Sequence, residues 1–331
     1  MSTTPSRSRV RKIAIDGRSE PELLRMVRGH YDSEPLMRLE GEIHFDAALS
    51  RAEVEAAALV YGRPMPPVAY LPCCGTLRHV PALLERGVER LVAADLSLAS
   101  LTAGLMRNAP DVPASRLSVY HADVRRPDAF LPGGGVPFIF LGGNSFGDVT
   151  SVEGHAEFIR SLAAALAPGG VLVFDYVGDR YAAGTQDTMT EWPETYLSDT
   201  GDIAVIDART RRSSPVPGTA MSILRFTSTI RHARTGELIV GAHGYDKLVV
   251  PDALLAEQFA DAGLELTNAG RVADLSPYHR ERIRRVGDLG MLGEPACFYR
   301  AVKETTNHRP AAVRTAATAR TAPRTRGEGS R

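Results

Sequence analysis

The stretch from residue 68 to residue 177 alternates short apolar runs with longer segments of helical periodicity. The apolar runs are PVAYL, RLVAAD, RLSVYHAD, VPFIFLGG and VLVFDYV. Three of the segments between them, RHVPALLERG, SLASLTAGLMRN and EGHAEFIRSLAAALA, have ten residues or more. Strands separated by helices of this length pair in parallel and carry helices on both faces of their sheet. The pattern therefore predicts an α/β fold.

The segments on either side of this stretch differ from it. An N-terminal helical cap over residues 19–64 is predicted from two helical runs, PELLRMVRGHYD and DAALSRAEVEAAALVYG. The first of them begins with a capping-box spacing of Ser19 and Glu22. Several β-rich runs predict an insertion over about residues 181–250, with a hairpin turn at residues 233–236.

The end of the main domain and the two termini complete the expected organisation. A helix, PDALLAEQFADAG, and two strands, LELTNAG and ACFYRAV, close a domain that spans residues 65–303. Residues 1–18 and 304–331 lack apolar periodicity, and we expect both to be disordered.

The charges of the chain balance, since Lys plus Arg and Asp plus Glu each number 39. A formal net charge of zero gives no global attraction to nucleic acid or anionic lipid, so we expect neither as a partner. No apolar run approaches the roughly 18 residues of a membrane helix, and no secretory signal is evident. Cys73, Cys74 and Cys297 form neither a disulfide framework nor a zinc spacing. We therefore expect a cytoplasmic protein without a bound metal.

Residues suited to ligand binding follow four successive strands. Gly75 lies in the turn CCGT, where a glycine lets the backbone approach a ligand closely. Asp95 ends the next strand, where a carboxylate can accept hydrogen bonds from both hydroxyls of a ribose. Asp123 ends the third strand and could accept from the amine of an adenine, and Asn144 follows the fourth. Taken singly, Gly75 could serve only a tight turn, and a strand-terminal Asp such as Asp95 could serve only as a helix cap. The four positions share one edge of the predicted sheet, which favours a single binding site.

These same runs resemble class I S-adenosylmethionine-dependent methyltransferases, in the small-molecule branch whose first motif reads close to PCGTGRH. The likeness extends from LPCCGTLRH through HADVRRP and NSFGD to LAPGGVLVFDY, over residues 65–177. It implies a Rossmann-like, doubly wound, mostly parallel sheet with a C-terminal antiparallel strand, and S-adenosyl-L-methionine as cofactor. By this resemblance the residues that bind the cofactor are Tyr31, Cys73, Gly75, Thr76, Asp95, Leu96, Asp123, Val124 and Asn144.

One position departs from the family pattern. Leu77 stands where the family has a second glycine, and a branched side chain there would narrow the room beside the amino-acid end of the cofactor. A shifted fold, a weaker affinity and a repurposed site remain open as consequences. The dinucleotide fingerprint G-x-G-x-x-G is missing around Gly75, which counts against a dehydrogenase.

Fewer residues can be assigned to the acceptor, the molecule that would receive the methyl group. Displacement at a sulfonium mainly requires that the acceptor be held in line with the methyl group, and no particular catalytic motif is needed for that. His155 follows the NSFGD motif and is the candidate catalytic residue, although a solvated histidine is the alternative. By the resemblance, Phe146 would border the sulfonium and the acceptor. The other candidates for acceptor binding are His243 and Tyr245, on one face of the insertion, and Trp192, whose alternative is to anchor that insertion.

The sequence thus predicts a methyltransferase that acts on nitrogen or oxygen of a small molecule, in specialised metabolism. Two alternatives stay open: non-methylating chemistry such as cyclisation with the same cofactor, and a non-catalytic regulatory role. Pairing of the insertion with its copy across a two-fold axis would give a homodimer, and the oligomeric state stays open.

Overall fold

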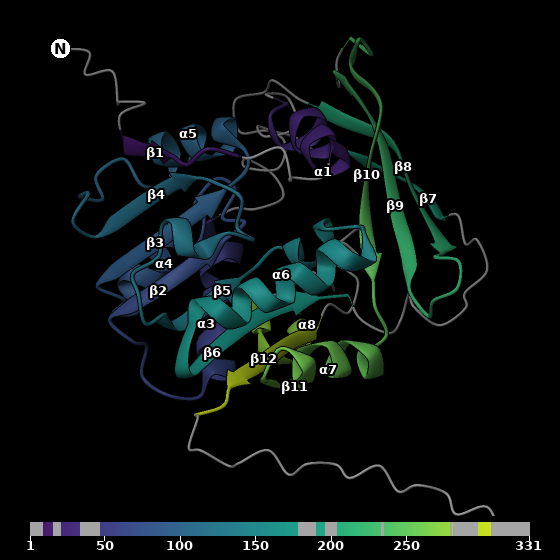
Figure 1. Cartoon of the computed structure of the whole chain (residues 1–331). Coiled ribbons are helices and arrows are strands. Elements are labelled where there is room, and N and C mark those ends of the chain that lie inside the picture. Colours follow the sequence, from purple (N-terminus) through teal and green to yellow (C-terminus); the bar gives the residue numbers. More distant parts are fainter. Residues whose placement is uncertain are drawn as a thin grey trace, which may run out of the picture.

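The computed structural model describes residues 9–15, 21–33, 47–177, 190–195, 204–232, 235–278, 280 and 297–305. These residues form an eight-stranded central sheet, helices on both of its faces, and a separate four-stranded antiparallel sheet that stands beside it (Figure 1). Ser19, half of the expected capping box, lies outside the described residues, as do residues 1–8, 16–18 and 306–331 of the expected disordered termini.

The central sheet has the predicted doubly wound, mostly parallel topology. Its strand order is β1-β4-β3-β2-β5-β6-β12-β11, and β1 to β6 all pair in parallel. The C-terminal strand β12 is antiparallel to both of its neighbours, as expected. The bounds are β1 (Val10–Lys12), β2 (Val68–Pro72), β3 (Arg90–Asp95), β4 (Leu117–His121), β5 (Val136–Leu141), β6 (Leu166–Tyr176), β11 (Leu264–Arg271) and β12 (Cys297–Lys303).

Two apolar cores lie on the two faces of this sheet, because its strands carry apolar side chains in both directions. One core takes its helical residues from α6 and α7, including Phe158 and Phe259. The other takes them from α3, α4, α5 and α8, including Val54 and Leu101. The helices are α3 (Ala47–Tyr61), α4 (Val80–Glu85), α5 (Leu98–Arg107), α6 (Val152–Ala165), α7 (Asp252–Asp261) and α8 (Val272–Leu275).

Strand β1 corrects the expectation that residues 1–18 are all disordered. Val10–Lys12 pairs in parallel with β4, and the Val10 side chain is buried. Arg11 donates from Nη1 to the Tyr120 hydroxyl at 2.9 Å. Three residues are too few to show a periodicity in the sequence. The strand forms because it pairs with a distant strand, so no local pattern predicts it.

The N-terminal helical run is shorter and less regular than predicted. The helix α1 (Pro21–Met26) passes into a π-helical turn, η2 (Val27–Tyr31). The carbonyl of Tyr31 accepts hydrogen bonds from the hydroxyls of Ser97 (3.0 Å) and Ser100 (2.9 Å) at the start of α5. Widened turns of this kind occur often at functional sites. Here the turn holds the N-terminal segment over the carboxyl ends of the central strands.

The predicted β-rich insertion forms the second sheet. Its order is β10-β9-β8-β7, with β7 (Thr190–Thr195), β8 (Ala204–Pro215), β9 (Ser222–His232) and β10 (Leu238–Val249) all antiparallel. The pairing of β9 with β10 confirms the predicted hairpin. The inner end of β10 packs on the central domain, where the Tyr176 hydroxyl donates to the Leu248 carbonyl (2.7 Å) and accepts from the Val250 amide (2.8 Å).

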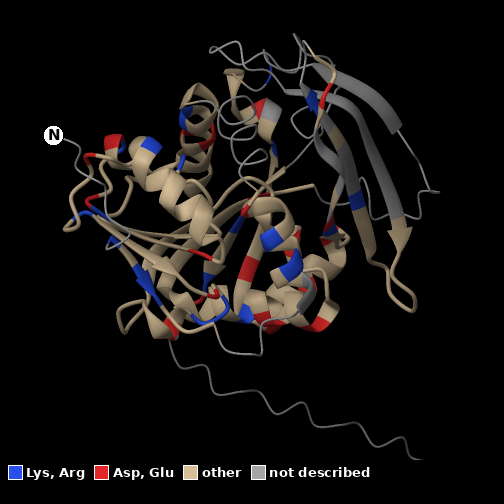
Figure 2. Ribbon diagram, turned by 90° about the horizontal axis from the view of Figure 1, so that it is seen from above, with Lys and Arg blue, Asp and Glu red and all other residues tan. Residues whose placement is uncertain are grey.

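Acidic and basic side chains are interspersed over the described elements (Figure 2). None of the helices within the described ranges is both long and apolar enough to cross a membrane.

Candidate functional site

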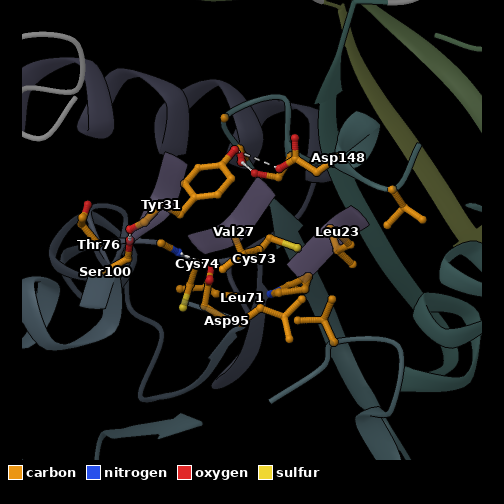
Figure 3. Close-up of a pocket in the computed structure, with 18 of the residues that line it drawn as sticks. Leu23, Val27, Tyr31, Leu71, Cys73, Cys74, Thr76, Asp95, Ser100 and Asp148 are labelled. Atoms are coloured by element: carbon orange, nitrogen blue, oxygen red, sulfur yellow. Dashed lines mark hydrogen bonds between the residues drawn. The ribbon is translucent and has the colours of Figure 1, made fainter. Parts of the chain in front are cut away.

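A cavity opens at the carboxyl edge of the central sheet, where β2 lies between β3 and β5. The chain winds outward from β2 to β4 and returns on the other side to β5, so this is the topological switch point at which open α/β sheets bind ligands. The cavity is lined by the turns after β2, β3, β4 and β5, and by side chains from α1, η2, η5 (Ser145–Asp148) and β10. Figure 3 shows the Tyr31 ring pointing toward Asp148, to which its hydroxyl is hydrogen-bonded, with Cys73, Cys74 and Asp95 on the same side of the cavity as the central strands.

The turn after β2 is built from left-handed backbone at alternate residues. Cys73, Gly75 and Leu77 have φ values of 49°, 48° and 58°. Such values suit glycine and cost other residues conformational energy, so packing must hold the turn in place. Helix α5 supplies part of that packing, because a Cβ on Gly104 would lie 2.3 Å from the Thr76 carbonyl oxygen. Asn108 also donates to this carbonyl, at 2.7 Å.

Leu77 does not narrow the cavity, contrary to expectation. Its side chain is 1% exposed and belongs to the core that includes α3, α4 and α5. The backbone keeps a glycine-like φ while the side chain turns away from the cavity. The Leu77 side chain therefore belongs to the core and does not enter the lining of the cavity.

Asp95 is held by two backbone amides. Its Oδ2 accepts from the Gly75 amide at 2.7 Å, and its Oδ1 accepts from the Ser97 amide at 2.8 Å. Burial raises the pKa of Asp95 to about 6 and outweighs the two amide hydrogen bonds, which lower it. Each carboxylate oxygen has two lone pairs, so each Asp95 oxygen retains capacity for one more donor. A pair of vicinal hydroxyls supplies two such donors.

Asp123 is paired with an arginine that the sequence analysis did not single out. Arg125 donates from Nε to Oδ1 (3.1 Å) and from Nη2 to Oδ2 (2.8 Å), and its backbone amide also donates to Oδ1 (3.0 Å). Both residues line the cavity together with Val124. The fork of Arg125 fixes the orientation of the Asp123 carboxylate in the lining of the cavity.

A second buried ion pair joins three separate elements at the cavity. Lys247 of β10 donates from Nζ to Asp148 Oδ1 at 2.5 Å and to the Asn144 carbonyl at 2.8 Å. The Tyr31 hydroxyl donates to the other oxygen of Asp148 at 3.1 Å. Lys247 is 2% exposed and Asp148 is 9% exposed. The pair therefore ties the insertion and the N-terminal segment to the end of β5, in the lining of the cavity.

A third polar cluster lies beside the turn after β2. Glu53 of α3 accepts hydrogen bonds from Arg78 Nη1 and from His79 Nε2, the latter at 2.6 Å. Burial raises the pKa of Glu53, but Arg78 and His79 outweigh it and bring the pKa to about 2. Burial and Arg78 lower the pKa of His79 to about 4. Glu53 is thus ionised and His79 neutral, and both Arg78 and His79 line the cavity.

The structure gathers eight of the predicted cofactor-binding residues around this one cavity: Tyr31, Cys73, Gly75, Thr76, Asp95, Leu96, Asp123 and Val124. Asn144 is not among the lining residues. Its φ is 54°, its backbone amide donates to both oxygens of Asp175 (3.1 and 3.0 Å), and its carbonyl accepts from Lys247. Asn144 therefore shapes the loop after β5 through its backbone.

Two residues expected on the acceptor side lie in the core. Phe146 is fully buried, with ring centroids of Phe174 and His155 at 4.5 and 4.7 Å. His155 is also fully buried in α6, and burial lowers its pKa to about 4. Neither side chain lines the cavity, so the geometry argues against acceptor contact by either residue.

The remaining predicted residues lie in the insertion. Trp192 belongs to β7, where it pairs with Arg209, and His243 and Tyr245 belong to β10, opposite Ser228 and Phe226. Their side chains fall outside the described part of the chain. The alternation that grouped His243 with Tyr245 continues to Lys247, so this pattern would have found the buried lysine.

The two adjacent thiols do not form a nucleophilic site. Burial and the nearby Asp95 raise the pKa of both Cys73 and Cys74. A thiol needs its thiolate form to attack, so both are inert at neutral pH.

Several solved structures, two of the three described below being methyltransferases, share this fold. An amino pentose methyltransferase from Micromonospora echinaspora, involved in calicheamicin biosynthesis and solved with S-adenosylmethionine bound, is 17% identical, with a TM-score of 0.54 over 78% of this chain and 92% of its own. DesVI from Streptomyces venezuelae is 18% identical, with a TM-score of 0.56 over 78% and 92%. The CcbJ methyltransferase from Streptomyces caelestis is 19% identical, with a TM-score of 0.55 over 77% and 89%.

At these identities the likeness establishes the fold, which is the Rossmann-like fold of S-adenosylmethionine-dependent methyltransferases. No protein-family model and no curated protein sequence matches the chain.

Proposed function

We propose that the chain binds S-adenosyl-L-methionine in this cavity and transfers its methyl group to nitrogen or oxygen of a small molecule. The observation that carries the proposal is the pair of carboxylates Asp95 and Asp123, which follow neighbouring strands and line one cavity with the turn at Gly75. The hydrogen-bonding capacity of Asp95 fits two ribose hydroxyls, and the carboxylate of Asp123 is the kind of group that accepts from an adenine amine.

The order of the strands supports the same assignment. Side chains after β4, β3 and β2 meet the cavity in that spatial order, with the β5 loop beyond them. Neighbouring strands lie roughly 4.8 Å apart, so the cavity spans about three such steps along the sheet edge. An adenosine with a chain attached to its ribose fits such a row, with its base on the β4 side and its chain toward β2 and β5.

The Tyr31, Asp148 and Lys247 group is the proposed wall for the acceptor. When bound, the cofactor supplies an electrophilic methyl group on a sulfonium. A nitrogen or oxygen nucleophile loses a proton as it is methylated, and a carboxylate such as Asp148 can accept the hydrogen bond of that proton. Lys247 and Tyr31 hold the carboxylate in place from two sides. The apolar side chains of Leu23 and Val27, also in the lining, exclude water.

The structural neighbours suggest the kind of acceptor. They include the amino pentose methyltransferase and a sugar N-methyltransferase from a Streptoalloteichus species, which is 18% identical with a TM-score of 0.53. We therefore propose a small molecule of specialised metabolism as the acceptor, with the insertion selecting it.

Calorimetry with S-adenosylmethionine is the first test. The purified protein should bind the cofactor, and Asp95→Ala should weaken binding tenfold or more because two charge-assisted hydrogen bonds are lost. Asp111→Ala, at an exposed position away from the cavity, is the matched control and should bind normally. A wild-type protein that does not bind the cofactor would contradict the proposal.

Mass spectrometry then separates methyl transfer from the alternatives. Incubation with the cofactor and a panel of amino sugars and related amines or alcohols should give products heavier by one CH₂ unit. Products of unchanged carbon count would favour cyclisation, and binding without any product would favour a regulatory role.

A further inference from the structure

We propose that the acceptor atom is the oxygen of an uncharged hydroxyl group, and that the buried Asp148–Lys247 pair selects it over an amine nitrogen. This inference rests on the proposed function and narrows its class of acceptor. It gives a chemical role to the group formed by Tyr31, Asp148 and Lys247, which come from η2, η5 and β10 and are hydrogen-bonded to one another in the lining of the cavity.

The charges of this group compensate each other. Lys247 Nζ lies 2.5 Å from Asp148 Oδ1, and both side chains are largely buried. The other two acids among the described lining residues are Asp123, which is paired with Arg125, and Asp95, which is assigned to the ribose. A cationic acceptor would therefore find no uncompensated carboxylate beside it. At neutral pH an aliphatic amine carries its proton, as a lysine side chain does, so the pair disfavours such an amine.

The Asp148 carboxylate can accept the hydrogen bond of a hydroxyl. Its Oδ1 accepts from Lys247, and its Oδ2 accepts from the Tyr31 hydroxyl at 3.1 Å. A carboxylate oxygen has two lone pairs, so each of the two retains capacity for one more donor. The contact with Tyr31 shows that a hydroxyl inside this cavity reaches the carboxylate (Figure 3). An acceptor hydroxyl needs one further contact of the same kind.

The charge of Lys247 favours oxygen over nitrogen during the reaction as well. The hydroxyl oxygen bonds to the methyl carbon as the carbon–sulfur bond breaks, the electron pair of that bond stays on sulfur, and the hydroxyl proton passes to Asp148. The products are a methyl ether, S-adenosylhomocysteine and protonated Asp148, which returns its proton to solvent. Negative charge builds on the oxygen as its proton leaves, and a buried ammonium stabilises that charge. An amine nitrogen gains positive charge as it attacks, and the ammonium opposes it.

Apolar side chains of the N-terminal segment lie beside this group. Leu23 of α1 and Val27 of η2 are buried and line the cavity, and η2 packs against β10, the strand that carries Lys247. An acceptor held against these side chains loses its hydration. Desolvation costs a charged ammonium far more than a neutral hydroxyl, so the apolar lining acts in the same direction as the ion pair. The selection thus needs only the charge of Lys247, whose Nζ remains bonded to Asp148 and to the Asn144 carbonyl.

The test uses two probes, glucosamine and tyramine, each of which carries both hydroxyl and primary amine groups. Each probe is incubated with the protein and S-adenosylmethionine at neutral pH, and fragmentation in the mass spectrometer assigns the added methyl group to oxygen or nitrogen. The readout is the ratio of O-methyl to N-methyl product, in which a general loss of activity cancels. We expect the wild-type protein to favour oxygen by about tenfold or more.

Two variants of the ion pair should lower this ratio. Lys247→Met leaves Asp148 as an uncompensated carboxylate that stabilises positive charge on an amine, so the ratio should fall about tenfold or more. Lys247→Met/Asp148→Asn removes both charges without leaving one unpaired, and the ratio should fall because the hydroxyl loses its proton acceptor. Arg225→Met is the matched control. It removes a cation of the insertion from the exposed pair with Asp246, next to Lys247 in β10 but outside the cavity, and should keep the wild-type ratio.

The outcomes distinguish this inference from the proposed function. If S-adenosylmethionine does not bind to the wild-type protein in calorimetry, the proposed function fails. If the wild-type protein methylates mainly nitrogen, the inference is overturned while the proposed function stands. Cofactor binding without methyl transfer to either probe would also overturn the inference, and so would a preference for oxygen that neither Lys247 variant lowers, because the ion pair would then not be its cause.

Discussion

Removing Lys247 should destabilise the protein far more than removing both members of its ion pair. Lys247→Met leaves the Asp148 carboxylate with the Tyr31 hydroxyl but without the ammonium at 2.5 Å. Breaking a fully buried pair costs about 3–5 kcal/mol. The Asp148 side chain is 11% exposed, so water relieves part of the penalty and we expect a loss of about 3 kcal/mol, at the low end of that range.

The double variant Lys247→Met/Asp148→Asn removes both charges and nearly conserves volume. We expect it to cost less than about 1.5 kcal/mol, because neither member is left as an uncompensated charge. Asp148→Asn alone leaves the ammonium with neutral acceptors and should cost about 2 kcal/mol. The sum of the two single losses would then exceed the double loss by at least about 3.5 kcal/mol, which is the coupling free energy between the residues.

Urea unfolding of the four proteins, followed by circular dichroism, measures these free energies. Tyr31→Phe is the control for the smaller contact and should cost about 1 kcal/mol, the value of one hydrogen bond. An unchanged slope of free energy against urea shows that the same structure unfolds in every variant. Single losses that simply add up to the double loss would refute the reasoning, since the two charges would then not be coupled.

Three further predictions concern pH. Burial holds the pKa of Asp95 at about 6, above its usual 3.8, so S-adenosylmethionine should bind more weakly as pH falls from 7.5 through 6, because protonation removes an acceptor. The ligand-free protein should gain stability from this group over the same range. In calorimetry, the affinity of Asp95→Asn for the cofactor should depend less on pH than that of the wild type. The pKa of Glu53 is lowered from 4.5 to about 2, so the roughly 3 kcal/mol by which its ionised form stabilises the fold is fully present above pH 4.5 and is lost toward pH 2. The difference in unfolding free energy between wild type and Glu53→Gln should therefore shrink from pH 4.5 to pH 2. A difference that stays constant would contradict the ion pair. Burial lowers the pKa of His155 from 6.5 to about 4, so as pH falls the unfolded state takes up the proton before the folded state does. The unfolding free energy of the wild type should therefore fall by about 3 kcal/mol between pH 6.5 and 4 because of this group. Unfolding at several pH values should show that His155→Leu removes this fall, and the variant should bind the cofactor normally.

The sequence was sufficient to predict the elements between residues 68 and 177, because each strand and helix there carries its own apolar periodicity. The β9–β10 hairpin was predictable for the same reason, since its strands flank a local turn. Strand β1 was not, because its three residues acquire their structure only by pairing with β4, more than a hundred residues away.

The site divides along the same line. Asp95 and Asp123 were predicted because a carboxylate at a strand end is visible in a local pattern. The Lys247–Asp148 pair joins residues 99 positions apart, and the Glu53–Arg78 pair joins residues 25 apart on different elements. Phe146 and His155 were misplaced because they neighbour the NSFGD motif in sequence, whereas the turn η5 and helix α6 direct both side chains into the core.

The attachment of the insertion through Tyr176 has a consequence for how this protein can change. The Tyr176 hydroxyl at the end of β6 is hydrogen-bonded to the main chain on both sides of Val249, so the position of the inner end of β10 is set by the central sheet. We therefore expect that changes in the outer part of the insertion leave the place where Lys247 enters the cavity unchanged. Chimaeras that join a foreign insertion outside residues 247–250 should keep the cavity and acquire a new choice of acceptor.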